Sequence, residues 1–404
     1  MANVLLTDQL IAKEALMIVE NNLTVTKRIN RRYESKFAQE GKKIGDTLSI
    51  RYPVRVQGRQ GEEMNEEDIE EQSVDLVIDQ LEGQDLSFSN VDLTLKVEDF
   101  RRRYLDTSCA FIANRIDRFF CTRYLDVPNF QGTPGTVPTS TQTYLNAGVT
   151  LSDYGVPPGD RYLVISPQMQ ATIINALQGL FQAAGSIAEQ YRTGQMGYAL
   201  GFDWAYNQNI RSHTVGALGG VPVVNGASQS GSTLVTDGWT ASTGAVEQGD
   251  IIDAAGAEGV NPMSKDATGN RRQYTVTADA TANGSGQMTI SISPSIVLSG
   301  AYQNVSAAPT NDGAIRIFGH ASTYASTATR QGLAFHKEWF TAAFVDLELP
   351  KGMEMSARAK SNQLGIAIRI VKGYDIRKNK HLCRLDVLFG GKQMYGDFAC
   401  RVAS

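Results

Sequence analysis

Residues 45 to 57 read GDTLSIRYPVRVQ, and this stretch decides how the rest of the sequence is interpreted. Apolar and polar side chains alternate along it, which is the two-residue period of a half-buried strand. A second extended leg is predicted from Ser73 to Lys96, and Gly61 to Gln72 between the legs carries seven carboxylates that repel one another. Because an isolated two-stranded ribbon is marginally stable in water, we expect the arm of residues 44–96 to be held by something outside it.

The segments on either side of the arm predict helices. A helix is expected from Thr7 to about Glu20, and a long one from Val97 to about Leu125, because apolar residues recur in both at helical spacing. The run Arg161 to Ile165 predicts a short buried strand. Ser166 and Pro167 follow it as a helix N-cap and first helical residue, opening a helix to about residue 181.

The second half of the sequence is rich in predicted strands. From about Gly219 to His320 the composition shifts to Gly, Ala, Ser, Thr and Val with short alternating runs, which indicates an inserted all-β domain. Further strands are expected at Ala342 to Leu349, Leu364 to Val371 and His381 to Phe389. The whole pattern predicts an α+β fold.

The composition excludes several classes of protein. A formal net charge of -4 over 404 residues argues against a dedicated binder of nucleic acid or anionic membranes. We expect no secretion signal and no membrane span, because no apolar run approaches about 20 residues. The four cysteines lack CxxC spacing, so neither disulfides nor zinc are expected, and all four are predicted to be buried as small hydrophobic side chains.

No enzyme motif occurs in the sequence. Metalloprotease, hydrolase, phosphate-loop and dinucleotide-binding signatures are missing, so we predict no catalytic, cofactor or metal residues. His213, next to Ser212, is expected to be a surface or turn histidine. His381 and Cys383 share one face of a predicted strand, but two ligands do not make a zinc site.

The acidic tip of the arm has three interpretations: a solvated loop, a docking surface for a neighbour's basic groups, and, less favoured, a cation site. Exposed ion pairs contribute about 0 to 1 kcal/mol each, but a symmetric assembly repeats them many times. The candidate inter-subunit contact residues are Glu62, Glu63, Glu66, Glu67, Asp68, Glu70, Glu71, Arg51, Arg55, Arg59, Arg101, Arg102 and Arg103.

The order of parts resembles that of the major capsid proteins of tailed bacteriophages, which have the Hong Kong 97-type fold. Within them the chain resembles the coat-protein family of short-tailed Salmonella-type podoviruses, whose members carry an immunoglobulin-like insertion. Three motifs carry the resemblance: GDTLSIRYPV entering the arm, GYALGFDWAYNQNI (Gly197 to Ile210), and LGIAIRIVKGYDIRKNKHLCRLDVLFGGK (Leu364 to Lys392).

The resemblance implies a division of the chain into named parts. These are an N-terminal arm (1–43), an E-loop arm (44–96), a spine helix and peripheral domain (97–144), an axial domain (145–218), an inserted β-barrel or immunoglobulin-like domain (219–321), and a segment that completes the axial and peripheral domains (322–404).

The resemblance also implies a function. The chain would assemble with itself, as hexamers and pentamers, into an icosahedral head enclosing double-stranded DNA, which it would contact non-specifically. A portal protein and a separate scaffolding protein would be partners, a membrane would not, and the protein would be found in the virion capsid after assembly in the host cytoplasm.

Some relatives with this fold join subunits covalently through a lysine on the arm tip and a neighbour's asparagine. The present sequence has no lysine between Ile44 and Leu95, so we expect non-covalent contacts. Two alternatives remain open from the sequence: an encapsulin-type nanocompartment shell, and a β-rich phage decoration or adhesin protein.

Overall fold

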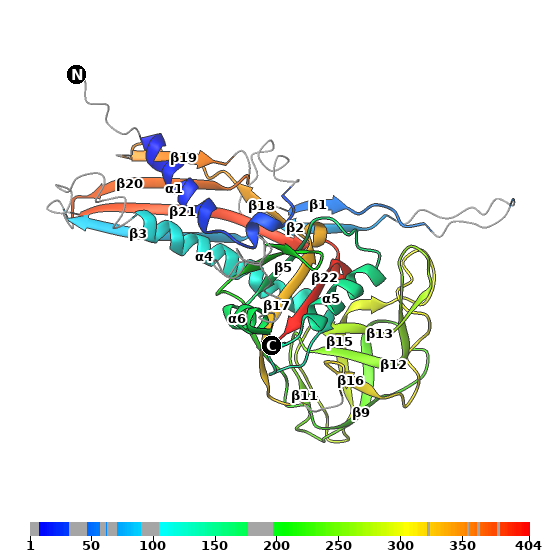
Figure 1. Cartoon of the computed structure of the whole chain (residues 1–404). Helices are drawn as coiled ribbons and strands as arrows, with labels where there is room; N and C mark the ends of the chain where they lie inside the picture. The colour runs from blue at the N-terminus through cyan, green and yellow to red at the C-terminus, as the bar shows by residue number, and fades with distance from the viewer. Residues whose placement is uncertain are drawn as a thin grey trace. The chain divides into compact units, whose positions relative to one another are not determined.

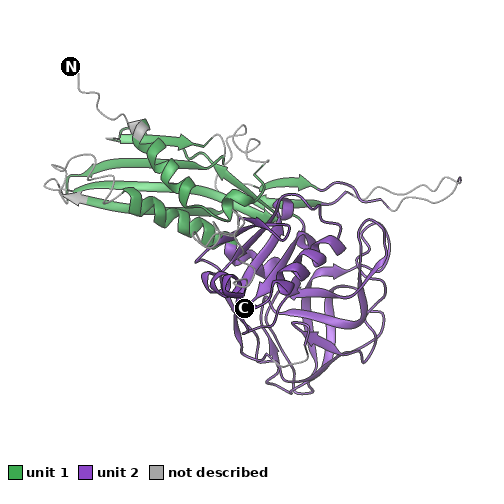
Figure 2. Cartoon of the chain, in the orientation of Figure 1, with its two compact units in different colours: residues 1–51, 73–120, 340–394 green, residues 52–72, 121–339, 395–404 purple. Residues whose placement is uncertain are grey.

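The structure, a computed structural model, describes residues 8–31, 47–56, 62, 71–89, 105–176, 197–320, 324–353, 355–361, 364–377 and 380–404. These form two compact units (Figure 2). Unit 1 contains residues 1–51, 73–120 and 340–394, and unit 2 contains residues 52–72, 121–339 and 395–404. Helices and largely antiparallel sheets occur in the chain, so the predicted α+β class is confirmed.

Unit 1 is built on a five-stranded sheet in which β21 pairs with β18, β20 and β3, and β20 pairs with β19 (Figure 1). A separate two-stranded ribbon joins β1 and β2. The strands are β1 (Thr47–Arg51), β2 (Ser73–Val77), β3 (Gln80–Ser89), β18 (Phe340–Val345), β19 (Met355–Lys360), β20 (Ala367–Asp375) and β21 (Lys380–Gln393). The helices are α1 (Asp8–Asn22), the short 3-10 helix η1 (Thr26–Arg28) and α4 (Asp106–Thr122).

The arm is shorter than the sequence predicts. The hairpin β1–β2 forms as expected, and the Tyr52 N–H continues it by donating to the Gln72 carbonyl at 2.8 Å. The return leg, however, becomes β3, which pairs with β21 over ten residues, with Gln80 opposite Phe389 and Ser89 opposite Lys380. The second half of that leg is therefore a strand of unit 1 and is held by its own chain.

Several side chains lie on other faces than predicted. Val54 and Val56 were expected on the buried face of a strand, yet they are 40% and 64% exposed and follow the end of β1. In the helices, Met17 of α1 and Phe111 of α4 are 51% and 46% exposed, although Ile112, Ile116 and Phe120 are buried as predicted.

Asp117 of α4 is a buried carboxylate that the helical spacing of apolar residues did not predict. Its oxygens accept hydrogen bonds from the Thr24 N–H (2.7 Å), the Thr26 N–H (3.2 Å) and the Thr26 hydroxyl (2.8 Å). Burial raises the pKa of Asp117, and these donors oppose that rise. Through these hydrogen bonds, α4 fixes the position of the turn at Thr24 to Thr26 that follows α1. Residues 97–104, where the long helix was expected to begin, lie outside the described residues.

Unit 2 contains a seven-stranded sheet in the order β4-β22-β17-β5-β7-β6, with β8 also pairing with β17. Its strands are β4 (Asn129–Gln131), β5 (Arg161–Ile165), β6 (Tyr198–Ala199), β7 (Phe202–Tyr206), β8 (Ser212–Thr214), β17 (Ala328–His336) and β22 (Ala399–Ala403). Its helices are α5 (Thr141–Asp153) and α6 (Pro167–Ala176), with short 3-10 helices η4 (Arg123–Asp126), η6 (Lys337–Trp339) and η7 (Gly396–Phe398).

The predicted strand Arg161–Ile165 and the helix after it are confirmed. Ser166 caps that helix, since its hydroxyl accepts the Met169 N–H at 3.2 Å. The predicted end near residue 181 lies outside the described residues. Helix α5 was not predicted, although Ser140 gives the same signal by accepting the Gln142 N–H at 3.1 Å.

The rest of unit 2 is an all-β segment, residues 220–317, which we call the β-module. Its ladders are all antiparallel, and its strands β9–β16 form ladders with one another. They are β9 (Gly220–Val224), β10 (Gly231–Trp239), β11 (Ala245–Val246), β12 (Ile251–Val260), β13 (Ala267–Val276), β14 (Ala280–Thr281), β15 (Met288–Ile296) and β16 (Ile315–Ile317). The all-β expectation is confirmed. A separate inserted immunoglobulin-like domain stays a prediction, since the apolar core of the β-module includes Phe130 and Ala403.

The pairing of β3 with β21 can be tested at Gly83. A Cβ there would lie 2.6 Å from the Leu385 carbonyl oxygen and 2.7 Å from Asp386 Oδ1. We expect Gly83→Ala to lower the free energy of unfolding by about 1 to 3 kcal/mol through overpacking. Gly373→Ala on β20 is the matched control, because its Cβ would meet the flexible Met353 Sδ at 3.3 Å. Urea unfolding of the soluble subunit measures both; equal stabilities would contradict the pairing.

Candidate functional site

The predicted inter-subunit residues are partly placed by the structure. Arg51 on β1, Glu62 and Glu71 are exposed, and Arg55 is half-buried with its guanidinium 5.6 Å from the centre of the Tyr302 ring. Arg55 thus contacts an aromatic side chain of its own unit, which the sequence did not indicate. The remaining candidates lie outside the described residues: Glu63, Glu66, Glu67, Asp68, Glu70, Arg59, Arg101, Arg102 and Arg103.

Aromatic packing holds the part of the arm that belongs to unit 2. The Tyr52 ring lies 5.3 Å from that of Tyr395, which stacks on Phe398 at 4.8 Å. Burial, reinforced by Tyr395 and opposed by Arg55, raises the pKa of Tyr52 to about 12. The Tyr52 hydroxyl therefore stays neutral at physiological pH, and the aromatic packing holds Tyr52 within unit 2.

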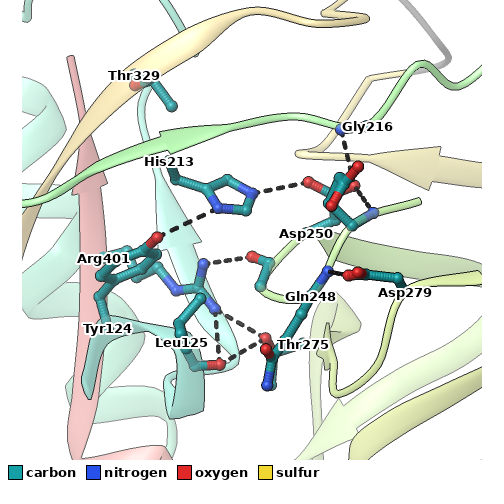
Figure 3. A network of polar contacts seen from close by, with 12 residues as sticks. Tyr124, Leu125, His213, Gly216, Gln248, Asp250, Thr275, Asp279, Thr329 and Arg401 are labelled. Carbon is teal, nitrogen blue, oxygen red and sulfur yellow. Dashed lines mark hydrogen bonds and ion pairs between the residues drawn. The ribbon is translucent and has the colours of Figure 1, made fainter. Parts of the chain in front are cut away.

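A buried polar network connects the β-module to the other strands of unit 2 (Figure 3). His213 on β8 is 4% exposed, with Nε2 2.8 Å from Asp250 Oδ1 and Nδ1 3.3 Å from the Tyr124 hydroxyl. The neutral ring satisfies both contacts if Nε2–H donates to Asp250 and Nδ1 accepts the tyrosine proton. Asp250 Oδ2 also accepts the N–H groups of Gly216 (3.1 Å) and Glu247 (2.9 Å).

Arg401 on β22 forms the other half of this junction. Its guanidinium is fully buried and donates to the carbonyls of Val127 (2.8 Å), Gly249 (2.6 Å) and Leu125 (3.4 Å), and to the Thr275 hydroxyl (2.8 Å). Burial lowers the pKa of Arg401 to about 10, with Tyr124 and Asp250 opposing the change. The side chain remains a cation at neutral pH, and one residue near the C-terminus ties the β-module to the residues that follow α4.

A second set of contacts joins β13 to its surroundings in unit 2. Arg272 is 1% exposed, pairs with Asp397, and lies 4.5 Å from the centre of the Tyr154 ring. Burial alone would lower the pKa of Arg272, but Asp397 more than offsets this, so the pKa is raised. The side-chain amide of Gln273 next to it accepts the Phe130 N–H (2.7 Å) and donates to the Phe130 carbonyl (3.2 Å).

The prediction for His213 was wrong: the side chain is buried rather than on the surface. The signal available was the alternation of β8, in which Ser212 and Thr214 are exposed and His213 is buried. Nothing in the sequence pointed to Asp250 or Arg401, because all their partners except the Glu247 N–H lie more than 30 positions away in the chain.

All four cysteines are free and buried, as predicted. Within the described ranges no group of three or more His, Cys, Asp or Glu side chains could hold a metal ion. Of the helices that the structure describes, none has the length and apolar character needed to cross a membrane.

The junction predicts a large effect of removing the Asp250 carboxylate. Asp250→Ala would leave His213, the buried Gly216 N–H and the part-buried Glu247 N–H without their acceptor, so we expect a loss of at least about 2 kcal/mol in the free energy of unfolding. Asp279→Ala is the matched control, because Asp279 is exposed and accepts a single N–H, that of Gln248. Its loss should be about 0.5 kcal/mol. Comparable losses in urea unfolding would refute a structural role for the junction.

One comparison of the sequence with known proteins gives a match over nearly its whole length. Residues 1–396 match the family described as P22 coat protein, gene protein 5. No curated protein matches the sequence.

Three solved structures illustrate the structural likenesses. One from Mycobacterium phage Che8 has a TM-score of 0.48 at 14% identity, covering 94% of this chain and 90% of that chain. The capsid of Ralstonia phage GP4 gives 0.46 at 10% identity, covering 93% and 87%. The capsid of cyanophage P-SCSP1u gives 0.44 at 12% identity, covering 89% and 84%.

The family match shows which family the chain belongs to, because it extends over nearly the whole sequence. It also agrees with the Hong Kong 97-type fold that the sequence resemblance implies. The chain belongs to the P22 coat protein family, and it is a major capsid protein that builds the phage head shell from identical subunits and not an enzyme.

Proposed function

We propose that this coat protein assembles as hexamers and pentamers whose subunits are held by non-covalent contacts, with residues 52–72 of each subunit acting as a clasp on a neighbour. The observation that carries the proposal is the arm itself. The two strands of the arm, β1 and β2, pair over only five residue pairs. After the end of β1, Val54 and Val56 are 40% and 64% exposed. A segment that carries these exposed valines beside seven carboxylates is suited to bind another copy.

The chemistry of the clasp favours accurate placement over high affinity per contact. Exposed ion pairs contribute about 0 to 1 kcal/mol each, and charge complementarity mainly steers association and sets register. A closed shell repeats every contact many times, so weak and reversible contacts can add up to a stable particle. Reversibility also allows misplaced subunits to leave during growth.

The finer partners are part of the same proposal. A scaffolding protein and a portal protein are expected from the resemblance to podovirus coat proteins, and packaged double-stranded DNA would be contacted non-specifically. The net charge of -4 is typical of a protein that attracts DNA weakly, as a container for DNA would, and not of a tight DNA binder. Assembly in the host cytoplasm fits four free cysteines, since that compartment keeps thiols reduced. Membership of a coat protein family favours this function over a cargo nanocompartment or a decoration protein.

Deleting residues 58–72 tests the clasp. We expect the shortened chain to remain a soluble folded subunit, because the described sheets lie outside the deletion, but to form at least tenfold fewer shells. Electron microscopy and sedimentation of particles from cells that also express the phage's scaffolding gene measure this. In the control chain, Gln or Asn replaces each of the seven carboxylates and the arm keeps its full length. This control separates the effect of removing the charges from the effect of shortening the arm. Normal shells from the deletion would disprove the clasp.

The lysine-free arm gives a second prediction. Shells dissolved by boiling in detergent should release a single species of 43.9 kDa, because the arm between Ile44 and Leu95 has no lysine for an amide link to a neighbour. Denaturing electrophoresis of purified heads checks it. A ladder of multiples of that mass, resistant to reducing agent, would show that subunits are linked covalently after all.

A further inference from the structure

The residues that follow β1 contact two separate parts of unit 2. The Tyr52 ring packs against Tyr395, and three residues later the Arg55 guanidinium lies 5.6 Å from the centre of the Tyr302 ring. Tyr302 belongs to the β-module, in the segment between β15 and β16. The start of the arm is therefore held at two points by its own subunit, and the second point lies on the β-module.

The segment that carries Tyr302 is itself held by hydrogen bonds. The side-chain carbonyl of Asn304 accepts the Val297 N–H (3.0 Å), and its amide group donates to a carbonyl of β15 (2.7 Å). The Lys265 ammonium donates to the Ala301 carbonyl (2.6 Å), which connects the segment to the turn between β12 and β13. The Tyr302 ring is thus attached to a part of the β-module that has a defined position.

The contact between Arg55 and Tyr302 is weak. A guanidinium is attracted by the negative face of an aromatic ring, and at a partly exposed site this attraction shifts an equilibrium about two- to fivefold. The ammonium of Lys265 opposes it. Burial lowers the pKa of Lys265, and the positive charge of Arg55 lowers that pKa further, so the two cations lie close together. A change in either partner of the contact should therefore be enough to release Arg55.

The side chains next to Arg55 are turned away from the β-module. Arg55 is half-buried against Tyr302, whereas Val54 and Val56 on either side of it are 40% and 64% exposed. Adjacent exposed apolar side chains gain free energy when a partner covers them. The contact that holds Arg55 inward thus leaves both valines available to another molecule.

We propose that Arg55 is a positioning residue that acts inside its own subunit: docked on Tyr302, it sets the direction of the arm and presents Val54 and Val56 to a neighbouring copy. Arg55 was expected among the residues that contact a neighbouring subunit, whereas here it acts within one chain. The inference rests on the proposed clasp and deepens it by naming the contact that prepares the clasp before a neighbour arrives. Such preorganisation strengthens binding, because less conformational freedom is lost on association.

Limited trypsin digestion tests the contact in the free subunit. Trypsin cleaves after Arg55 only when that side chain has left the ring and entered the protease. We expect Tyr302→Leu to raise the rate of this cleavage about two- to fivefold, and the conservative variant Tyr302→Phe, which keeps an aromatic ring, to restore the original rate within about twofold. Mass spectrometry of the fragments identifies the cleaved bond.

Phe111→Leu is the matched control for the digestion. It removes a contact of the same kind, Arg115 at 5.8 Å from the centre of the Phe111 ring, from α4 in unit 1. The rate of cleavage after Arg55 should not respond to this change. A rate for Tyr302→Leu no higher than that for Phe111→Leu would overturn the proposal.

Assembly tests whether Arg55 acts through Tyr302 or through a neighbouring copy. Arg55→Gln, Tyr302→Leu and the chain with both changes are each expressed with the phage's scaffolding gene, and shells are counted by electron microscopy and sedimentation. Each single change should lower shell yield at least about threefold, and the double change should lower it no further, because both remove one contact. Urea unfolding should give the same midpoint for all four chains. Effects that multiply would assign Arg55 to a neighbour and contradict the proposal.

The outcomes separate this inference from the clasp on which it rests. If deletion of residues 58–72 abolishes shells while Arg55→Gln and Tyr302→Leu leave their yield unchanged, the positioning role is wrong and the clasp stands. If the deletion leaves shells normal, the clasp fails, and the positioning role of Arg55 in assembly fails with it.

Discussion

The ten-residue pairing of β3 with β21 is the constraint on which unit 1 depends. It converts the return leg of the arm into a sheet strand, and it thereby sets the point at which the ribbon β1–β2 leaves the sheet. Gly83 shows how close the two strands are, because any side chain there would collide with the Leu385 carbonyl. The same long strand also pairs with β18 and β20, so β21 is paired with every strand of this sheet except β19.

Unit 2 depends on a different kind of interaction. Arg401 and Asp250 are fully buried ions, and burial of a charge costs several kcal/mol unless hydrogen bonds replace its water. Both are richly bonded, but mostly to backbone groups and not to each other. These hydrogen bonds form only when the backbone groups lie in one arrangement. They therefore specify how the β-module packs against the other strands of unit 2. A purely apolar contact of the same size would allow the β-module to shift relative to these strands.

Sequence analysis reached the elements whose signals are local. The strand Arg161–Ile165, its capped helix and the all-β character of the β-module were predictable because apolar period, capping residues and composition act over a few residues. The sequence analysis assigned β3 to the arm and not to a sheet. The alternation of apolar and polar residues in β3 is the same whether its partner strand is about 300 residues away or missing. His213 and Asp117 were missed because a buried polar side chain depends on donors that only the folded chain brings near it.

The contrast between the two kinds of polar contact explains how one chain can be both rigid and able to assemble. Buried groups such as Arg401 have no competing water, so their bonds persist and hold the subunit in one shape. Exposed groups such as Arg377 and Glu71 are solvated and screened by salt within about 10 Å, so each contact forms and breaks easily. A shell needs subunits that keep their shape while their contacts are sampled and corrected. In this chain the strong polar interactions lie inside the units, and we propose that the arm makes the weak, repeatable ones between subunits.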